Sequence, residues 1–414
     1  LYDKRNQVSF VSQGIISYLA GQKSVLNQSS YSSVEELKAA GLNMQMETVV
    51  EEIDTKNKRL FYRRVNSKKT KLALYDKLIF ATGSYPAMTS VPFDKKSKLY
   101  FLKSMDDAIK TDEFLKTAKN IAVIGGGMTG VEVARIAQER GIQTTLIHRN
   151  KNLLNDYLDE PASHLLESWM NAEGTRLLLN TEVTEIGSDE ENTIIQTANG
   201  QKIPVDGVIF TIGFRPNSHL LNQQVELGDS GAVIVDEYMQ TSCPDVFAVG
   251  DVSTTYVNLL EKSYYLPHAS DAVRDGEIAA INLLAPRQKI NSSQGTYHVP
   301  MNNLVMAMTG ITIRQAVDAG YDADAVHLLN EHLDGYSPSN IWMIYERRTH
   351  QILGLQCIGK TSDMAEYVNI FSLAIQQKLK IEDIEFTDFY FEHGYKDPRG
   401  LNRILARLVR ENER

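Results

Sequence analysis

The sequence predicts two doubly wound α/β domains, one inserted into the other, followed by a smaller α+β domain. Length is the first observation, because 414 residues exceed one ordinary domain. The second is the segment 121–150, which reads as an apolar strand, a glycine turn, an amphipathic helix and another strand. The third is that apolar strands running into glycine-bearing turns recur on both sides of it, at 75–86 and 241–251. One unit interrupting another of the same kind explains all three.

The inserted domain is expected to occupy residues 113–235. Beyond the strand–turn–helix–strand segment, three apolar runs separated by polar turns predict further strands, at 176–180, 193–197 and 207–213. The pieces on either side, residues 1–112 and 236–292, are expected to fold together as the interrupted domain, with a helix over 268–284.

The sequence changes character after residue 292. The segment 340–360 predicts a β-hairpin, and 363–379 predicts a long amphipathic helix. We therefore expect residues 293–414 to form an α+β domain. The segment 385–395 concentrates aromatic side chains that a monomer would not usually expose, so it predicts either a dimer contact or, alternatively, an internal core strand.

Composition excludes several classes of protein. The hydrophobic share of 43% and the charged share of 23% are typical of a globular protein in water. A net charge of -9 argues against a nucleic-acid or anionic-membrane partner, and no apolar run is long enough to span a membrane. The cysteines, Cys243 and Cys357, have no metal-ligand or CxxC spacing. We expect no metal site, no disulfide framework and a reducing, cytoplasmic location.

The beginning of the chain gives a separate expectation. Leu1 is not an initiator methionine, and the first ten residues lack the basic and apolar regions of a signal peptide. They read as the end of a strand running into a loop. We therefore expect further chain to precede Leu1 in the whole protein.

The glycine turn at 125–130 is the strongest chemical signal. GGGMTG matches G-x-G-x-x-G between a strand and a helix, the context that indicates a Rossmann-like dinucleotide site. The first glycine permits the tight turn, the second lets the backbone approach a pyrophosphate, and the third allows close strand–helix packing. The anion would then lie at a helix N-terminus. The residues predicted to bind the nucleotide here are Gly125, Gly127, Met128, Thr129 and Gly130.

The end of the second strand bears on which nucleotide is bound. A carboxylate there would accept the ribose hydroxyl of NAD, but His148 and Arg149 occupy the position. Arg149 could instead pair with the 2′-phosphate of NADP, or it could be a solvated surface charge. The sequence leaves NADH and NADPH both open.

Four segments together carry a resemblance to a known family: SFVSQGIISYLAG (9–21), YDKLIFATG (75–83), TIGFRPN (211–217) and TSCPDVFAVGDV (241–252). They resemble the pyridine nucleotide–disulfide oxidoreductases, in the branch of NADH oxidases, NADH peroxidases and coenzyme A-disulfide reductases. The resemblance implies an FAD domain, an inserted NAD(P) domain and a C-terminal dimerisation domain, hence a homodimer. It runs through essentially the whole chain.

Site residues follow from the resemblance position by position. Asp3 matches the acid that holds the FAD adenosine ribose, and Val50 matches a backbone contact to the adenine. Asp251 matches the acid near the ribityl chain, and the remaining matches to FAD are at Ala81, Thr82, Gly83, His268 and Ala269. Tyr157 and Gly213 match residues that line the nicotinamide nucleotide.

Three departures from the family pattern modify this expectation. Gln13 stands at the position of the redox cysteine, and an amide has no thiolate or sulfenic acid state. Met128 replaces a tyrosine that often covers the flavin, and a thioether cannot donate a hydrogen bond. The glycine fingerprint that should precede Asp3 by about 20 residues is not in this sequence, and without it FAD binding would be badly weakened.

The resemblance therefore implies a flavoprotein that passes hydride from NAD(P)H to FAD and then electrons to oxygen or peroxide. Two alternatives stay open: a coenzyme A-disulfide reductase, and a redox-inactive nucleotide-binding sensor. Gln13 disfavours the reductase, and we expect direct reaction of reduced flavin with oxygen to give hydrogen peroxide.

Overall fold

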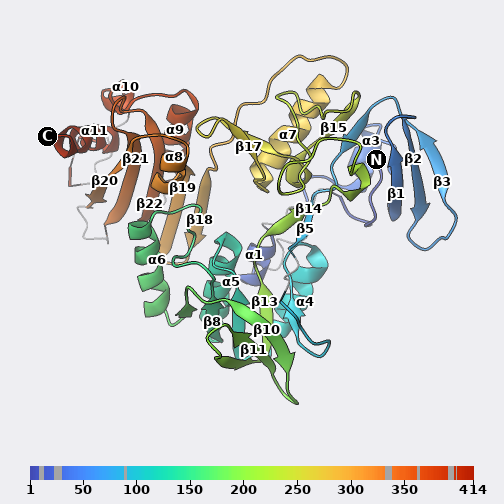
Figure 1. The fold of residues 1–414 in the computed structure, drawn as a ribbon, viewed down its shortest axis with the longest axis horizontal. Coiled ribbons are helices and arrows are strands. Elements are labelled where there is room, and N and C mark those ends of the chain that lie inside the picture. Colours follow the sequence, from blue (N-terminus) through green and yellow to red (C-terminus); the bar gives the residue numbers. More distant parts are fainter. Residues whose placement is uncertain are drawn as a thin grey trace.

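Three lobes make up the molecule (Figure 1). The computed structural model describes residues 1–8, 14–22, 30–87, 91–331, 338–360, 364–389, 396–397 and 399–414. The C-terminus lies at the left edge of the molecule and the N-terminus lies within the lobe at the right, and a central lobe, mostly green and teal, lies between and below these two lobes (Figure 1). None of the helices in the described part of the chain is both long and apolar enough to cross a bilayer.

A parallel five-stranded sheet organises the central lobe. Its strand order is β6-β13-β7-β8-β9, and every neighbouring pair is parallel. The strands are β6 (Leu99–Tyr100), β7 (Asn120–Ile124), β8 (Gln143–Ile147), β9 (Arg176–Leu178) and β13 (Gly207–Phe210). β7 is almost wholly buried, as expected of a parallel strand covered on both faces. The predicted strand–turn–helix–strand unit is confirmed.

Helices and a small antiparallel sheet complete this lobe. The helices are α4 (Met105–Leu115), α5 (Met128–Glu139) and α6 (Glu160–Ala172), and the sheet contains β10 (Val183–Ser188), β11 (Thr193–Thr197) and β12 (Lys202–Val205). α4 begins with a capping box. Ser104 Oγ accepts from the Asp107 amide at 3.2 Å, and the Asp107 carboxylate accepts from the Ser104 amide at 2.8 Å. Its Ala108 and Leu115 join the same core as Ile121 of β7.

The N-terminal lobe combines segments from both sides of the insertion. β4 (Leu78–Phe80) precedes it and β15 (Val246–Ala248) follows it, yet the two strands pair in parallel. This confirms that one domain interrupts another. The lobe's other strands are β1 (Thr48–Asp54), β2 (Arg59–Arg64) and β3 (Lys71–Leu74) in one antiparallel sheet and β16 (Thr255–Val257) with β17 (Lys262–Tyr264) in a hairpin. Its helices are α3 (Val34–Ala39), η1 (His219–Leu221), η2 (Gly250–Val252) and α7 (Ala269–Asn282).

The chain crosses between these lobes on a two-stranded antiparallel ribbon. β5 (Ser84–Pro86) leads out of the N-terminal lobe and β14 (Phe214–Pro216) leads back, and the two pair with each other. Both expected domain boundaries, at 113 and 235, lie C-terminal to these crossings. β6 precedes residue 113 and α4 begins before it, but both belong to the central lobe. Residues such as Val225 and Val233 precede 235 but pack in the N-terminal lobe.

The C-terminal lobe is an antiparallel sheet with helices. The strand order is β18-β19-β22-β21-β20, from β18 (Tyr297–Met301), β19 (Leu304–Gly310), β20 (Ala323–Asn330), β21 (Ser339–Glu346) and β22 (Ile352–Gly359). The helices are α8 (Ile313–Asp318), α9 (Met364–Gln376), α10 (Ile381–Glu385) and α11 (Leu401–Asn412). The predicted hairpin and long helix are therefore confirmed as β21–β22 and α9.

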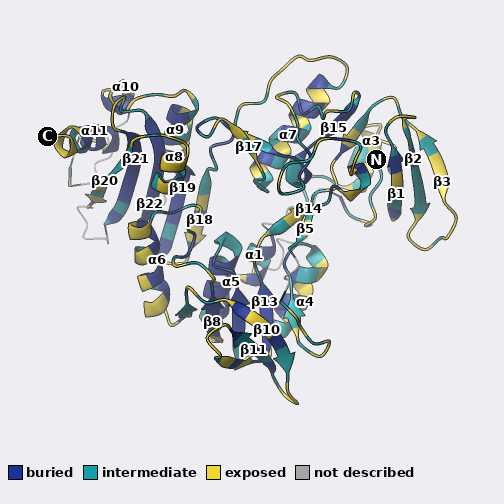
Figure 2. Ribbon diagram, viewed as in Figure 1, coloured by how far each residue is buried: buried dark blue, intermediate teal, exposed yellow. Residues whose placement is uncertain are grey.

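β22 is buried along its whole length, which Figure 2 shows as an unbroken dark strand. α9 contacts one of its faces, and α6 of the central lobe also contacts it. Side chains of this sheet accordingly belong to two cores, with Ile358 packing in the central-lobe core and Leu355 in a core with α9. The sheet is thus fixed against the central lobe by hydrophobic burial.

Candidate functional site

The glycine turn between β7 and α5 has the geometry of an anion site. Gly125 has a φ of +116°, and a Cβ there would lie 2.4 Å from the Thr211 carbonyl oxygen. A Cβ on Gly130 would lie 1.8 Å from the Gly125 oxygen, whereas one on Gly127 would meet nothing within 4 Å. Two glycines therefore permit close packing, and the third faces open space as a pyrophosphate contact requires.

The N-terminus of α5 is free to bind such a group. Gly127 is the N-cap, no side chain caps the helix, and no acid lies in its first turn. Its first N–H groups therefore lack intrahelical acceptors and favour an anion. The residues present fit the pyrophosphate of a nicotinamide dinucleotide.

His148 is held inside this turn. Its Nδ1 accepts a hydrogen bond from the Gly126 amide at 3.0 Å, so its proton is on Nε2, which lies 3.1 Å from Asn155 Oδ1. Burial lowers the pKa of His148, which favours this neutral form. Asn155 was not anticipated from the sequence, because no local pattern connects it with the turn. His148 therefore stabilises the turn with both ring nitrogens.

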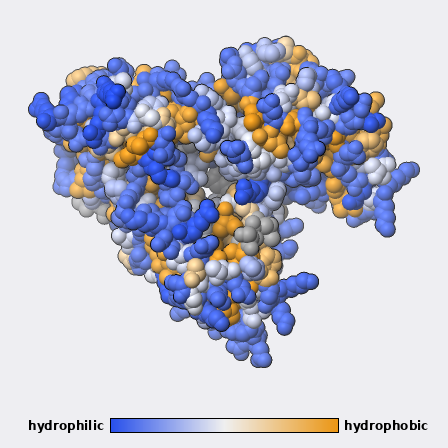
Figure 3. All heavy atoms as spheres, viewed as in Figure 1, coloured by the Kyte–Doolittle hydropathy of each residue, from blue (hydrophilic) through white to orange (hydrophobic). Residues whose placement is uncertain are grey.

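A cluster of rings joins all three lobes. The rings of Tyr157 and Tyr297 meet edge to face with centroids 5.2 Å apart, and the Tyr157 hydroxyl is hydrogen-bonded to Tyr297. His268, the N-cap of α7, lies against Tyr297 at 4.6 Å. The structure thus connects two predicted ligand-binding residues, Tyr157 and His268, through a tyrosine that sequence reasoning missed. The space-filling view is hollowed where the lobes meet, with hydrophobic atoms along part of the hollow (Figure 3).

The other residues predicted to border the nucleotide lie at the start of α5 and directly before β14. Met128 is the first residue of α5 and packs against the central core, and Gly213 adopts a φ of +97° directly before β14. Thr129 lies in the first turn of α5.

The N-terminal lobe offers a second sheet edge. Because β4 and β15 are parallel neighbours, Ala81, Thr82 and Gly83 emerge beside Gly250 and Asp251. Ligands of open parallel sheets bind at such carboxyl edges. Thr82 Oγ1 donates to the Asn217 carbonyl at 2.7 Å and Gly83 has a φ of +66°.

Asp251 is the central carboxylate of that edge. Its Oδ2 accepts from Ser84 Oγ at 2.8 Å and from Lys103 Nζ at 2.7 Å. The ammonium of Lys103 also lies 4.5 Å above the Phe214 ring. Neither partner was anticipated, because each is far from Asp251 in the sequence. Carboxylate oxygens have further lone pairs, so Asp251 can also accept from a ribityl hydroxyl.

Two more acids lie behind this edge, on α7. Asp271 accepts from Ser293 Oγ at 2.9 Å and pairs with Arg274. Burial opposes its charge, but His268 and Arg274 together hold the pKa of Asp271 below its usual range. Asp275 accepts from the Gly250 amide at 3.1 Å, and burial raises its pKa to about 6.

Asp3 and Val50 border the same lobe. Residue 2 pairs with Gln45 in a parallel bridge, and the Asp3 carboxylate accepts from the Arg5 amide at 2.9 Å. Val50 lies half-buried in β1. Ala269 opens α7, which has no side-chain cap, so its N–H groups are also available to a ligand. The carboxylates of this lobe fit the sugar hydroxyl groups of FAD, and the free amides of α7 fit a hydrogen-bond acceptor of the flavin.

Gln13, the predicted position of the redox centre, lies outside the described residues. The helix expected after it is present as α1 (Gly14–Leu19), whose Ile15 and Leu19 pack in the central core.

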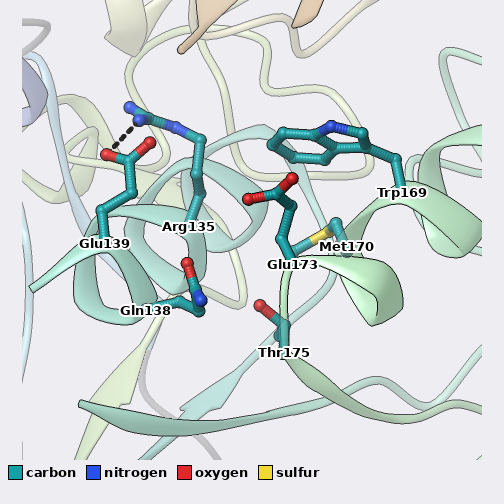
Figure 4. Close-up of a pocket in the computed structure, with 7 residues that line it drawn as sticks. All are labelled: Arg135, Gln138, Glu139, Trp169, Met170, Glu173 and Thr175. Carbon is teal, nitrogen blue, oxygen red and sulfur yellow. Dashed lines mark hydrogen bonds and ion pairs between the residues drawn. The ribbon is translucent and has the colours of Figure 1, made fainter. Parts of the chain in front are cut away.

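Glu132 is an acid that sequence reasoning missed. It lies one turn after Met128 on α5, and burial raises its pKa to about 7 although Arg135 opposes the shift. Farther along α5, Figure 4 shows a small cavity lined by Arg135, Glu173 and Trp169, with the Arg135 guanidinium turned toward Glu139, which it meets at 2.6 Å. Its volume of about 10 Å³ holds about one water molecule, so it is no nucleotide site. Across the described residues, no group of His, Cys, Asp or Glu side chains could hold a metal ion.

Comparison with known proteins agrees with this geometry. Residues 3–276 match the family described as pyridine nucleotide-disulphide oxidoreductase, and residues 299–391 match its dimerisation domain. The NADH oxidase of Enterococcus faecalis is 32% identical over 417 residues, covering 100% of this chain and 93% of the relative.

Solved structures with this fold include nucleotide complexes. The water-forming NADH oxidase from Lactobacillus brevis bound to NADH matches with a TM-score of 0.94 at 29% identity, over 100% of this chain and 92% of the other. An engineered water-forming NADPH oxidase derived from it, bound to NADPH, matches with a TM-score of 0.95 at 29% identity over the same shares.

Proposed function

Because the chain belongs to the pyridine nucleotide-disulphide oxidoreductase family, we propose that it is an FAD-dependent NAD(P)H oxidase that acts as a homodimer. The observation that carries the proposal is the pair of sheet edges, one with the glycine turn and one with Asp251, in a chain similar to NADH oxidases over its whole length. FAD bound at the edge with Asp251 would supply the acceptor for the hydride of NAD(P)H and the donor of two electrons to oxygen.

Each edge has a distinct task in this proposal. Gly125, Gly127 and Gly130 let the dinucleotide pyrophosphate approach the N-terminus of α5, with Met128 and Thr129 in its first turn. Tyr157 and Gly213 border the nicotinamide.

On the flavin side, Asp251 accepts a ribityl hydroxyl, and Asp3 and Val50 hold the adenosine end. The remaining flavin contacts come from the strand end and the helix start, at Ala81, Thr82, Gly83, His268 and Ala269. Because α7 has no side-chain cap, its first amides are available to the flavin.

The oxidant is proposed to be oxygen, with hydrogen peroxide as the product. The balance is NAD(P)H + H⁺ + O₂ → NAD(P)⁺ + H₂O₂. An amide at position 13 cannot form a sulfenic acid or a mixed disulfide, so neither thiol-dependent peroxide reduction nor coenzyme A-disulfide reduction is expected.

The test is anaerobic reduction of the purified full-length protein by each nicotinamide nucleotide, followed by mixing with air. We expect bleaching of the flavin absorbance, its return on mixing, and about one peroxide per nucleotide oxidised. A protein that binds the nucleotide but shows no flavin absorbance would be a sensor and would contradict the proposal.

Gln13→Cys tests the assignment of the product. The thiolate could reduce hydrogen peroxide to water and itself become a sulfenic acid, which a second NAD(P)H would reduce back to the thiol through the flavin. The peroxide yield should therefore fall well below one per NAD(P)H. Gln13→Ser is the matched control, because a hydroxyl has no sulfenic acid state. A starting protein that already reduces oxygen to water would show that position 13 does not decide the product.

A further inference from the structure

An open pocket lies beyond the ends of β8 and β9, with a volume of about 440 Å³. Its lining includes Arg149, which follows the end of β8, together with Asn150, Asn180, Thr181 and Asn199. β8 is the parallel neighbour of β7, so this pocket shares a sheet edge with the glycine turn. A dinucleotide whose pyrophosphate lies on α5 extends its adenosine along that edge.

Arg149 is an available cation in this pocket. Its side chain is exposed, and among the described residues no salt bridge or hydrogen bond holds its guanidinium. The next cation along the chain differs, because Lys151 pairs with Glu160 at 2.6 Å. A guanidinium can bind a phosphate through two parallel hydrogen bonds.

His148 stands where an acid that would repel a phosphate is usually found. It occupies the position of the ribose-binding acid, and its ring nitrogens face the Gly126 amide and Asn155. The strand end therefore carries no negative charge that would repel a phosphate. The side-chain amides of Asn180 and Asn199 add neutral hydrogen-bond donors, whereas the Thr181 hydroxyl already donates to the Leu179 carbonyl at 2.8 Å.

Glu182 is the acid in the pocket lining, and its carboxylate is expected to favour NADH where Arg149 favours NADPH. A carboxylate could accept the ribose 2′-hydroxyl of NADH, which is the role that the strand end lacks. Arg149 and Glu182 thus favour opposite nucleotides from the same pocket.

We propose that this pocket binds the 2′-phosphate of NADPH, with Arg149 as its principal ligand and Asn180 and Asn199 as further donors. The inference rests on the proposed function only in taking the substrate to be a nicotinamide dinucleotide. It makes NADPH the preferred reductant.

Binding of adenosine 2′,5′-bisphosphate and of adenosine 5′-monophosphate to the full-length flavoprotein, by titration calorimetry, tests the proposal without turnover. The bisphosphate should bind at least about tenfold more tightly, because it adds a charge-assisted contact. Arg149→Ala should remove this preference while the affinity for the monophosphate changes little. Lys151→Ala is the matched control and should keep the preference.

Glu182→Gln separates the two nucleotides further. Loss of the carboxylate should strengthen bisphosphate binding. Equal affinity of the starting protein for both ligands, or an equal loss of both in Arg149→Ala, would overturn the proposal, as would weaker bisphosphate binding in Glu182→Gln.

Failure of this inference and failure of the proposed function are distinguishable. If only the inference fails, oxygen is still consumed with NADH while the two adenosine ligands bind equally. If only the oxidase function fails, the bisphosphate preference remains while neither nucleotide supports oxygen consumption.

Discussion

The two sheet edges use charge in different ways. At the central-lobe edge the chain presents backbone amides and an exposed arginine, and its histidine is neutral. At the N-terminal-lobe edge it presents carboxylates that are paired with cations of the same chain, Asp251 with Lys103 and Asp271 with Arg274. The first edge suits an anionic group, and the second suits hydroxyl donors. The difference teaches that one protein can hold two dinucleotides by recognising different parts of each.

Substitution of the glycines at the central-lobe edge should have the largest effect on stability and nucleotide binding. Gly130→Ala places a methyl group 1.8 Å from a backbone oxygen that cannot give way, whereas Gly127→Ala meets nothing within 4 Å. We expect Gly130→Ala to lower the unfolding free energy by about 1–3 kcal/mol and to abolish NAD(P)H binding. Gly127→Ala should keep the stability and lose most of the affinity. Thermal unfolding and calorimetric titration separate the two, and equal loss of stability in both variants would contradict the assignment.

Dimerisation should be the next largest effect. Phe386 is 76% exposed in the described chain, which predicts burial against a second copy. Phe386→Asp should therefore convert the dimer to a monomer in light scattering. Leu74→Asp is a matched control, because Leu74 is also 76% exposed but lies on β3 of the N-terminal lobe. A dimeric Phe386→Asp variant would place the interface elsewhere.

A smaller effect is expected from Asp275, behind the flavin edge. Its pKa is raised to about 6, so the folded state holds the proton more tightly than the unfolded state does. Its stabilising contribution is thus greatest below the unfolded pKa near 4 and is lost as pH rises to about 6. Asp275→Asn, which keeps an acceptor for the Gly250 amide, should be more stable than the parent by about 1–3 kcal/mol at pH 8 and no more stable at pH 4.

Asp245 is the control for this prediction, because its pKa is shifted in the opposite direction from that of Asp275. Hydrogen bonds from Lys58 and Lys77 lower the pKa of Asp245 to about 2, so Asp245→Asn should be destabilising at pH 8 rather than stabilising. Urea titration of both variants at the two pH values measures the difference. A stability gain of Asp275→Asn that does not change with pH would show that the carboxyl charge is not its cause.

The sequence predicted those parts of the fold that local patterns determine. The strand–turn–helix–strand unit was predictable because the hydrophobic period changes at glycines that only a tight turn accommodates. The order of the lobes followed from repeated strand–glycine segments. β22 is different, because its complete burial depends on α6 of another lobe, and no pattern within residues 352–359 indicates which helix lies across it.

The candidate site divides in the same way. The glycine turn and the strand ends were predicted from local motifs, and the structure places them at sheet edges. Lys103 and Tyr297 were missed because each reaches its partner through the tertiary fold alone, and Asn155 was missed because it reaches His148 from a loop without a recognisable motif. These contacts depend on how segments pack in the folded chain, and local sequence patterns do not reveal that packing. The role of Gln13 stays a prediction from sequence, outside the described residues.

The β5–β14 ribbon has a mechanical consequence. Both polypeptide crossings into the central lobe are bonded to each other, with the Ala87 amide donating to the Gly213 carbonyl and the Asn217 amide donating to the Gly83 carbonyl. The central lobe is therefore attached to the N-terminal lobe through one hydrogen-bonded two-stranded ribbon, the strap, and not through two separate linkers. Because left-handed glycines stand at the entry to each strand, Gly83 for β5 and Gly213 for β14, bending is concentrated at diagonally opposite corners of the strap. The hydrogen bonds of the strap keep the two crossings side by side, so any bending at one glycine is shared by both strands.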